Sequence, residues 1–385
     1  MKDRGTFGII LWLICMIAFV DCSSVLAQQT RRETREQRLR RRREAIESRA
    51  TSPYQDTGKA LAGDRFRVGY QVLDLKDRRD NTERVITVAV WYPTTSTPKQ
   101  HIYGGPTRGN VALNGEPSAK GGPYPLLVFA HGYGGSGLNY VFLSEKFASY
   151  GWIVVAPDFH DRHSAVRIRT GQQEDFDRLG FLRHGREISN SGPDDRQPYL
   201  YRLDEMKVVL AQVLESEPFG KHIDKKKIAV GGHSFGGYTA LGLCGTIEER
   251  HDKRIKAVLL FSTGAAGYLF RESELAAVKM PSMYFLGERE RDTPRGTKTM
   301  VELADKVYRN LSPPKYLLEI KGANHFSFNN QLRNSFLRGT EKQFEVIRRY
   351  SIAFLEKHIE KNKGASEVLK QHDPLLTRYL RENGE

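Results

Sequence analysis

The stretch VGGHSFGGYT, residues 230–239, decides how the rest of this chain is interpreted. Its centre, Gly232-His233-Ser234-Phe235-Gly236, is a Gly-x-Ser-x-Gly pattern that follows the strand-like residues KIAV and precedes the helix-like residues GGYTALGLC. A strand-to-helix turn this tight strains the backbone of its central serine, and residues without a Cβ at Gly232 and Gly236 avoid a clash. The context therefore predicts a nucleophile elbow rather than a flexible loop, with the Ser234 hydroxyl near the positive end of the following helix.

A serine that attacks a carbonyl carbon needs hydrogen-bond donors for the oxyanion that forms. One donor is expected to be the backbone N–H after the nucleophile, which belongs to Phe235. The other is expected from the glycine-rich stretch FAHGYGGSG, residues 129–137, where Tyr133 would supply it. His131 in this stretch is expected to be a structural hydrogen-bonding group.

The general base is expected late in the chain. The stretch KGANHFSF, residues 321–328, places His325 directly after the last predicted strand. The carboxylate that orients this imidazole should follow the strand PSMYFLG, where the loop ERERDTP offers Glu288, Glu290 and Asp292. Asp292 is the favoured candidate, because it begins an Asp-Thr-Pro turn, and Glu290 is the reserve.

Short apolar runs alternate with amphipathic segments from about residue 65 onward. The expected strands are 66–75, 84–93, 125–132, 152–158, 227–233, 256–262, 281–287 and 315–322. The expected helices are 138–150, 202–216, 235–249, 297–309 and 341–361. The alternation predicts an α/β fold with a doubly wound, mostly parallel, eight-stranded sheet and flanking helices. This domain would span 65–362, with loop insertions at 95–123 and 159–200 and a C-terminal tail at 363–385.

The order of serine, acid and histidine, together with HGYGG, GGHSFGG and GANHF, resembles the α/β-hydrolase fold. Within that fold the chain is similar to platelet-activating-factor acetylhydrolases and dienelactone-hydrolase-like esterases. The stretches VAVWYP, LLVFAHGYGG, GWIVVAPDFHDRHSA and IAVGGHSFGG carry the similarity over about residues 65–360. The resemblance implies an enzyme without metal or cofactor that cleaves short-acyl carboxylic esters, phospholipid esters included, through an acyl-enzyme intermediate.

One feature departs from the acetylhydrolase pattern. In those enzymes the acid follows the strand after the nucleophile helix, but here that segment reads AVLLFSTGAAG and holds no carboxylate. An acid after MYFLG is instead similar to dienelactone hydrolases and cutinase-like polyester hydrolases. Both activities stay open as alternatives, and a non-catalytic binding protein with a hydrolase fold is a further alternative of another class.

Two other patterns carry competing interpretations. Residues 132–137 are also a Gly-x-Gly-x-x-Gly sequence, and Asp158 ends the next strand, as in dinucleotide-binding proteins. Two strands precede it, however, and a dinucleotide site would leave Ser234 and His325 unexplained. His160, Asp161 and His163 could suggest a metal site, but their spacing on a loop lets only two of them converge. Neither a metal nor a cofactor is expected.

The N-terminus predicts export. Residues 1–27 combine a charged start, an apolar run and small residues before Ala27, as in a cleaved signal peptide. Cys15 and Cys22 would leave with it, and Cys244 would remain as a buried thiol without a disulfide partner. A periplasmic or secreted location follows from this interpretation.

The formal net charge is +14, and part of it lies in the expected flexible extension at 28–64. Residues 31–49 hold nine Arg and four Glu. This segment suits contact with an anionic surface, and a solvated spacer is the alternative. It has no aromatic residues to stack on bases, so nucleic acid is not an expected partner.

Overall fold

The computed structural model describes residues 65–79, 83–173, 175–292, 294–295, 298–332 and 336–384. Residues 64–385 form one compact unit. The predicted signal peptide 1–27 and the Arg-rich segment 31–49 lie outside the described residues. Within the described ranges, no helix combines the length and the apolar character that crossing a membrane would require.

All eight predicted strands are present and lie in one sheet. They are β1 (Arg67–Asp77), β2 (Arg84–Thr94), β5 (Tyr124–Ala130), β6 (Ile153–Pro157), β9 (Ile223–His233), β10 (Ile255–Phe261), β11 (Ser282–Gly287) and β14 (Lys315–Ile320). Strands β3 (Lys99–Ile102), β4 (Arg108–Leu113) and β15 (Leu376–Glu382) extend it. The strand order in the described residues is β15-β14-β11-β10-β9-β5-β6-β2-β1-β4-β3. From β6 to β14 neighbouring strands are parallel, whereas β2 pairs antiparallel with both β1 and β6. The mostly parallel sheet is therefore confirmed.

The insertion 95–123, which was expected to be a loop, contributes β3 and β4 to the sheet edge. Strand β4 pairs parallel with β1, and β3 pairs antiparallel with β4. The reason is burial, since Tyr103 and Val111 are almost inaccessible to solvent despite the Gly- and Pro-rich composition around them. Apolar anchors in a polar segment thus order it against the sheet.

The segment 363–385, expected to be a tail, forms helix α11 (Ala365–Lys370) and strand β15. Strand β15 pairs antiparallel with β14 over most of its length. Val368, Leu369 and Leu376 are buried, so this segment packs as part of the fold.

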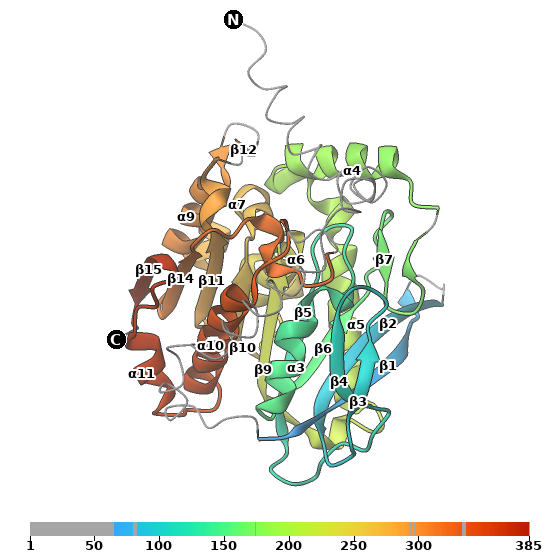
Figure 1. The fold of residues 1–385 in the computed structure, drawn as a ribbon. Coiled ribbons are helices and arrows are strands. Elements are labelled where there is room, and N and C mark those ends of the chain that lie inside the picture. The colour runs from blue at the N-terminus through green and yellow to red at the C-terminus, as the bar shows by residue number, and fades with distance from the viewer. Residues whose placement is uncertain are drawn as a thin grey trace, which may run out of the picture. The chain divides into compact units, whose positions relative to one another are not determined.

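Helices cover both faces of the sheet. On one face lie α3 (Val141–Ser149) and α10 (Glu341–His358) (Figure 1). The Phe142 and Phe344 rings of these two helices pack with their centroids 4.1 Å apart. On the other lie α5 (Tyr201–Glu215), α6 (Phe235–Leu241), α7 (Gly264–Leu269), α8 (Glu272–Ala276) and α9 (Met300–Asn310). The five predicted helices are present. The one predicted at 235–249 ends earlier, because a π turn at Gly242–Thr246 contains Gly245 at a φ of 112°.

The polar insertion 159–200 contains a short hairpin, β7 (Val166–Arg167) and β8 (Gly171–Gln172), and helix α4 (Arg178–Asn190).

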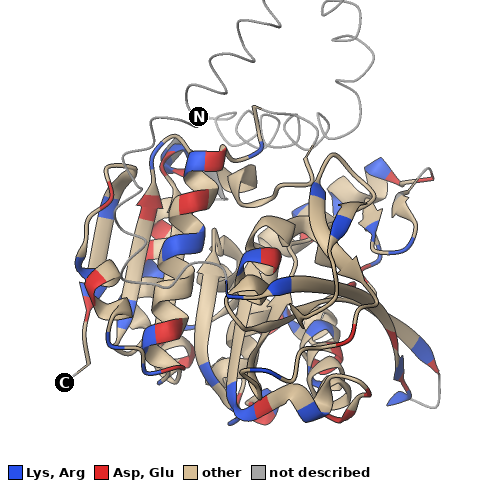
Figure 2. Ribbon diagram, turned by 60° about the horizontal axis from the view of Figure 1, so that its bottom comes forward, with Lys and Arg blue, Asp and Glu red and all other residues tan. Residues whose placement is uncertain are grey.

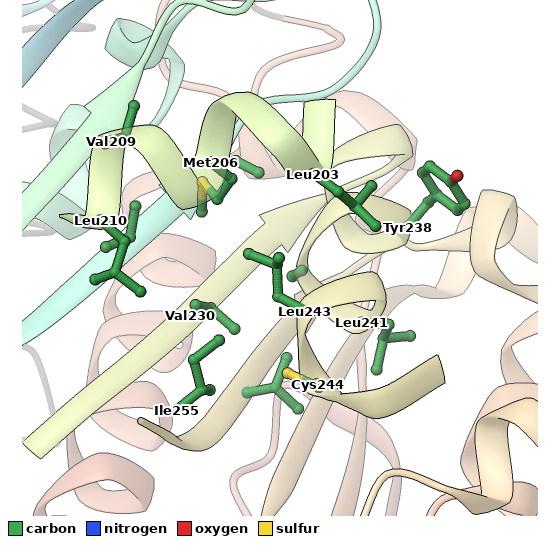
Figure 3. Packing of buried hydrophobic residues seen from close by; sticks show 14 of the residues in the cluster. Leu203, Met206, Val209, Leu210, Val230, Tyr238, Leu241, Leu243, Cys244 and Ile255 are labelled. Atoms are coloured by element: carbon green, nitrogen blue, oxygen red, sulfur yellow. The ribbon is translucent and has the colours of Figure 1, made fainter. Parts of the chain in front are cut away.

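The core behind the nucleophile elbow is tightly packed. Leu203 and Met206 of α5 face Val230 of β9 and the π turn that holds Cys244 (Figure 3). A Cβ added at Gly242 would lie 2.3 Å from Leu203, so α5 and the turn are in close contact. Cys244 is a buried free thiol, and burial raises its pKa far above the ordinary thiol value. Figure 2 shows Lys, Arg, Asp and Glu mainly on helices and strand ends, as expected for a sheet buried on both faces.

The sheet register gathers the ends of several strands at one edge. Ala130 at the end of β5 pairs with Gly232 of β9, and Phe261 at the end of β10 pairs with His233. The loops that follow β5, β9 and β10 therefore begin side by side. This edge, at the carboxyl ends of the parallel strands, is where α/β sheets carry their sites.

Candidate active site

Ser234 occupies a strained strand-to-helix turn. Strand β9 ends at His233 and α6 begins at Phe235, so one residue makes the whole turn, with φ 54° and ψ −118°. A Cβ on Gly232 would lie 2.1 Å from the Gly236 carbonyl oxygen, and a Cβ on Gly236 would lie 2.1 Å from the Ala130 carbonyl oxygen. Both glycines of the pattern are therefore required by backbone contacts, as the sequence predicts.

His325 lies within hydrogen-bond distance of Ser234, although 91 residues separate the two in the chain. Its Nε2 atom is 3.0 Å from the Ser234 Oγ atom. It begins a short 3-10 turn after β14, His325–Phe328, which the Asn324 side chain caps by accepting from the Phe326 N–H. The fold thus brings the predicted nucleophile and the predicted base together.

His233 supplies a contact that the sequence did not suggest. Its buried imidazole donates from Nε2 to the backbone carbonyl of His325 at 2.8 Å. Burial lowers the pKa of His233, so the ring is neutral and its Nε2 proton serves this bond. The position before the serine in the Gly-x-Ser-x-Gly pattern was the only available signal, and that position accepts many residue types.

Glu290, the reserve candidate, is the carboxylate that the structure places beside His325. Its Oε2 atom lies 3.2 Å from the His325 Nδ1 atom, and its side chain is fully buried. Its Oε1 atom accepts a hydrogen bond of 2.8 Å from the Gly287 N–H, which fixes the carboxylate at the end of β11. Glu288 accepts instead from the Gly322 N–H. Asp292 ends the same 3-10 turn, Glu288–Asp292, and its side chain lies outside the described part of the structure.

A hydroxyl that the sequence did not single out joins this group. Ser262, the first residue after β10, has its Oγ atom 2.6 Å from His325 Nδ1 and donates a short hydrogen bond to Glu290 Oε2. It is fully buried and has a positive φ of 48°. Its place after a strand beside β9 could have pointed to it, because that loop starts at the same sheet edge as Ser234.

The predicted oxyanion loop lies against the elbow. A Cβ on Gly132 would lie 3.2 Å from the Cβ of Ser234, so Tyr133 follows directly beside the nucleophile. Among the described residues, the N–H groups of Tyr133 and Phe235 have no hydrogen-bond acceptor. The Tyr133 ring stacks on Phe181 of α4 with centroids 4.7 Å apart, and its hydroxyl donates to the Phe181 carbonyl. Helix α4 therefore packs against this loop and fixes the Tyr133 side chain.

His131 has a structural position, as expected. It is fully buried, its Nδ1 donates to the Gly132 carbonyl at 2.7 Å, and its Nε2 accepts from the Phe159 N–H. Burial lowers the pKa of His131 to about 3, which keeps the ring neutral. The ring consequently links the predicted oxyanion loop to Phe159.

A buried ion pair lies beneath Phe235. The Arg202 guanidinium donates to both carboxylate oxygens of Asp161, at 2.9 and 3.0 Å, and both side chains are inaccessible to solvent. It lies 4.4 Å from the Phe159 ring centroid and 4.8 Å from that of Phe235. Asp161 is therefore engaged by Arg202, and in the described part of the chain no three His, Cys, Asp or Glu side chains are arranged for a metal ion.

Asp158 closes the glycine-rich loop from within. Its carboxylate accepts hydrogen bonds from the Ser136 hydroxyl, the Gly137 N–H and the Ile168 N–H at 2.6–2.9 Å. An acidic residue that binds a ribose would need to point outward from the strand end. The Asp158 carboxylate instead points inward to Ser136, Gly137 and Ile168. The Gly-x-Gly-x-x-Gly pattern here therefore forms the tight loop after β5.

The chain has the α/β-hydrolase fold: a mostly parallel sheet, a strained serine turn after β9, and a histidine loop after β14. A solved structure described as a ferulic acid esterase from Streptomyces cinnamoneus matches it with a TM-score of 0.57 and 19% identity, over 83% of this chain and 94% of the other. That likeness supports the fold.

Sequence comparisons point to one group within this fold. The family model "Platelet-activating factor acetylhydrolase, isoform II" matches residues 98–178, which include the predicted oxyanion loop. The platelet-activating factor acetylhydrolase of Cavia porcellus is 25% identical over 280 residues, 63% of this chain and 59% of that protein. The enzyme of that name from Canis lupus familiaris is 25% identical over 294 residues, 68% and 62%. The chain spans about 60% of the length of these two relatives.

Proposed function

We propose that this protein is a serine hydrolase of carboxylic esters that works through an acyl-enzyme intermediate. The observation that carries the proposal is the 3.0 Å contact between Ser234 Oγ and His325 Nε2 at a glycine-framed elbow. Glu290 lies behind the imidazole as the acid of the triad. The relatives named acetylhydrolase and esterase support the same reaction class.

In the proposed reaction, Ser234 Oγ forms a bond to the ester carbonyl carbon while its proton moves to His325 Nε2. The carbonyl oxygen becomes an oxyanion, which the N–H groups of Tyr133 and Phe235 would bind. The oxyanion then collapses, the bond to the alcohol oxygen breaks, and the Nε2 proton goes to that oxygen. Water then attacks the acyl-enzyme while the same Nε2 atom takes its proton. The bond to Ser234 Oγ breaks, the carboxylic acid product leaves, and Ser234 regains a proton from Nε2.

For the substrate we propose short-acyl esters, with phospholipid esters included. The relatives whose names contain acetylhydrolase support a short acyl group. The acid after β11 instead favours the alternative of dienelactone-hydrolase-like or cutinase-like polyester hydrolysis. A series of p-nitrophenyl esters of increasing acyl length separates these proposals: a maximum at acetyl or butyryl supports the first, and a maximum at long chains contradicts it.

A fluorophosphonate probe tests the reaction class directly, because it reacts with an activated serine. The wild-type protein is expected to be labelled and to hydrolyse p-nitrophenyl acetate, and the Ser234→Ala variant is expected to do neither. An unlabelled, inactive but folded wild-type protein would support a non-catalytic hydrolase-fold binding protein.

We also propose that the protein is exported, with residues 1–27 removed near Ala27. The Arg-rich segment 31–49 would then contact an anionic surface. Residue-by-residue sequencing of the N-terminus of the mature protein tests the first part, and retention of an unprocessed N-terminus in the cytoplasm contradicts it. Co-sedimentation with anionic and neutral vesicles tests the second.

A further inference from the structure

The Ser262 hydroxyl stands between the proposed base and the proposed acid. Its Oγ atom is 2.6 Å from His325 Nδ1, whereas the direct contact from Nδ1 to Glu290 Oε2 is 3.2 Å. Each of the two hydrogen bonds that the hydroxyl makes, to Nδ1 and to Oε2, is therefore shorter than the direct contact between the imidazole and the carboxylate. A serine hydroxyl has one proton and accepts through its lone pairs, so both neighbours can be served at once.

The direction of each hydrogen bond follows from the proton count. The Ser262 hydroxyl donates to Glu290 Oε2, so its single proton points to the carboxyl group. The hydroxyl oxygen can then only accept from His325, which requires the imidazole proton to be on Nδ1. The Nε2 lone pair is consequently directed toward the Ser234 hydroxyl, which is the arrangement that a general base needs.

The backbone holds Ser262 in an uncommon conformation for this purpose. Its φ of 48° lies in the left-handed region, which non-glycine residues rarely adopt and which costs free energy. The Ser262 N–H donates to the Phe285 carbonyl of β11 at 2.7 Å, so the residue is anchored to the strand that leads to Glu290. A strained residue that is fixed in this way at a reacting centre points to a role beyond packing.

We propose that Ser262 is a positioning residue, whose hydroxyl links Glu290 to His325 and fixes the Nδ1 proton of the imidazole. The inference rests on the proposed serine hydrolase function. When Nε2 takes the proton of Ser234, the imidazole becomes positive, and the polarised chain from Nδ1–H through the hydroxyl to the carboxylate stabilises that charge. No proton leaves Nδ1 in this step.

Two variants test the role. Ser262→Gly removes the hydroxyl and suits the positive φ, and Ser262→Ala removes the hydroxyl alone. Both are expected to lower kcat about ten- to a hundredfold with little change in KM, the range for one hydrogen bond to a charged group. Ser351→Ala is the matched control, since Ser351 is equally buried and its hydroxyl has no partner among the described residues. This control is expected to keep wild-type kcat.

A proton NMR measurement adds a readout that a packing role would not change. The wild-type Nδ1–H is expected to give a far-downfield resonance, assigned by its loss in His325→Gln, that moves upfield in both Ser262 variants and stays in Ser351→Ala. The inference is overturned if either the resonance or kcat is unchanged in Ser262→Gly. Should the wild type be inert to the fluorophosphonate probe, the proposed function fails, and the resonance still decides whether Ser262 holds the Nδ1 proton.

Discussion

At the scale of single residues, this site is built from positions where a side chain has almost no freedom. Ser234 and Ser262 both have positive φ values, each of which costs about 1–3 kcal/mol when the surroundings enforce it. Both lie directly after neighbouring parallel strands, and both face His325. The two residues whose hydroxyls contact the imidazole, one at each ring nitrogen, thus both have a strained backbone.

The identity of the acid gives the first prediction. Glu290→Gln is expected to lower kcat by about 10²- to 10⁴-fold, because the amide cannot stabilise the imidazolium and can favour the wrong tautomer. Asp292→Asn is expected to lower it far less, since Glu290 already occupies the position at Nδ1. Steady-state kinetics of both variants check this. Equal losses would contradict the assignment of Glu290, and a greater loss for Asp292→Asn would favour Asp292.

The second prediction concerns the elbow glycine. Gly236→Ala would place a Cβ 2.1 Å from the Ala130 carbonyl oxygen and 2.7 Å from that of His131, both of them backbone atoms. Overpacking of this kind costs about 1–3 kcal/mol, more than the gain of about 1 kcal/mol from replacing a helical glycine. We expect a lower urea midpoint and lost activity, because the oxyanion loop must move.

Gly192→Ala is the control for that measurement. A Cβ at Gly192 would meet only the Asp195 carboxylate at an ordinary distance of 3.6 Å. Its stability and activity should match the wild type. A Gly236→Ala variant that behaves in the same way would show that the elbow accepts a side chain.

At the scale of elements, α5 supports the loop after β6 and the start of α6 through one charged residue, Arg202. Burial alone would raise the pKa of Asp161, but the charge of Arg202 and the hydrogen bonds from Tyr201 and Arg202 act together to keep the pKa below its ordinary value. The guanidinium lies between the rings of Phe159, from the loop after β6, and Phe235, at the start of α6. The pair thus joins three elements behind the reacting centre.

Removing one partner of this pair is therefore the third prediction. Asp161→Asn leaves the Arg202 charge buried without compensation, at a cost of about 3–5 kcal/mol. Activity should fall as well, because Phe235 carries one proposed oxyanion donor. Asp74→Asn is the control: its partner Arg169 and Asp74 itself are about half exposed, so the loss should stay below about 1 kcal/mol. Equal effects of the two substitutions in urea unfolding would contradict the bracing role.

At the scale of the whole molecule, a buried chain of polar groups ties the 95–123 insertion to the sheet and its helices. The Trp91 indole of β2 donates to the Tyr103 hydroxyl at 3.0 Å, and this hydroxyl donates to Glu145 of α3 at 2.7 Å. Burial raises the pKa of Glu145 to about 7, although the Arg348 charge opposes the shift. The insertion is thus attached through a carboxyl group that titrates near neutral pH.

The fourth prediction follows from that pKa. A carboxyl whose folded pKa is raised from 4.5 to about 7 stabilises the fold fully below pH 4.5 and loses the contribution as pH rises through 7. The loss is up to about 3 kcal/mol, at 1.4 kcal/mol per pKa unit. Glu145→Gln should remove this part of the pH dependence. Urea unfolding of both proteins at pH 5 and pH 8 measures it, and parallel pH profiles would contradict the assignment.

The sequence predicted the parts of the molecule whose physics is local. Buried parallel strands are continuous apolar runs, so all eight strands could be predicted. The Gly-x-Ser-x-Gly pattern between a strand and a helix likewise predicts a tight turn. The β3 and β4 strands were hidden, because Tyr103 and Val111 anchor a segment of Gly- and Pro-rich composition. Strand β15 was also not predicted, because it pairs along one edge only and its charged residues break the continuous apolar run of a buried strand.

Within the site, the sequence could not predict which side chains point toward His325, because this depends on differences of a few ångströms in the loops. Ser234 and His325 follow from chain order, whereas three carboxylates within five residues can be told apart only by how the turn after β11 points them. Glu290 faces inward, and Glu288 turns to the Gly322 amide. Ser262 has no pattern of its own in the sequence, because the segment AVLLFSTGAAG holds no carboxylate and a serine there is an ordinary loop residue.

The pairing of β15 with β14 has a practical consequence for anyone who shortens this protein. Cutting the chain at residue 362 would strip the outermost strand and leave the backbone of Lys315–Ile320 without its neighbour. An uncovered apolar strand offers its amides and carbonyls to any similar strand, usually that of another copy, and precipitation follows. Affinity tags are accordingly better joined beyond residue 384 than substituted for the last twenty residues.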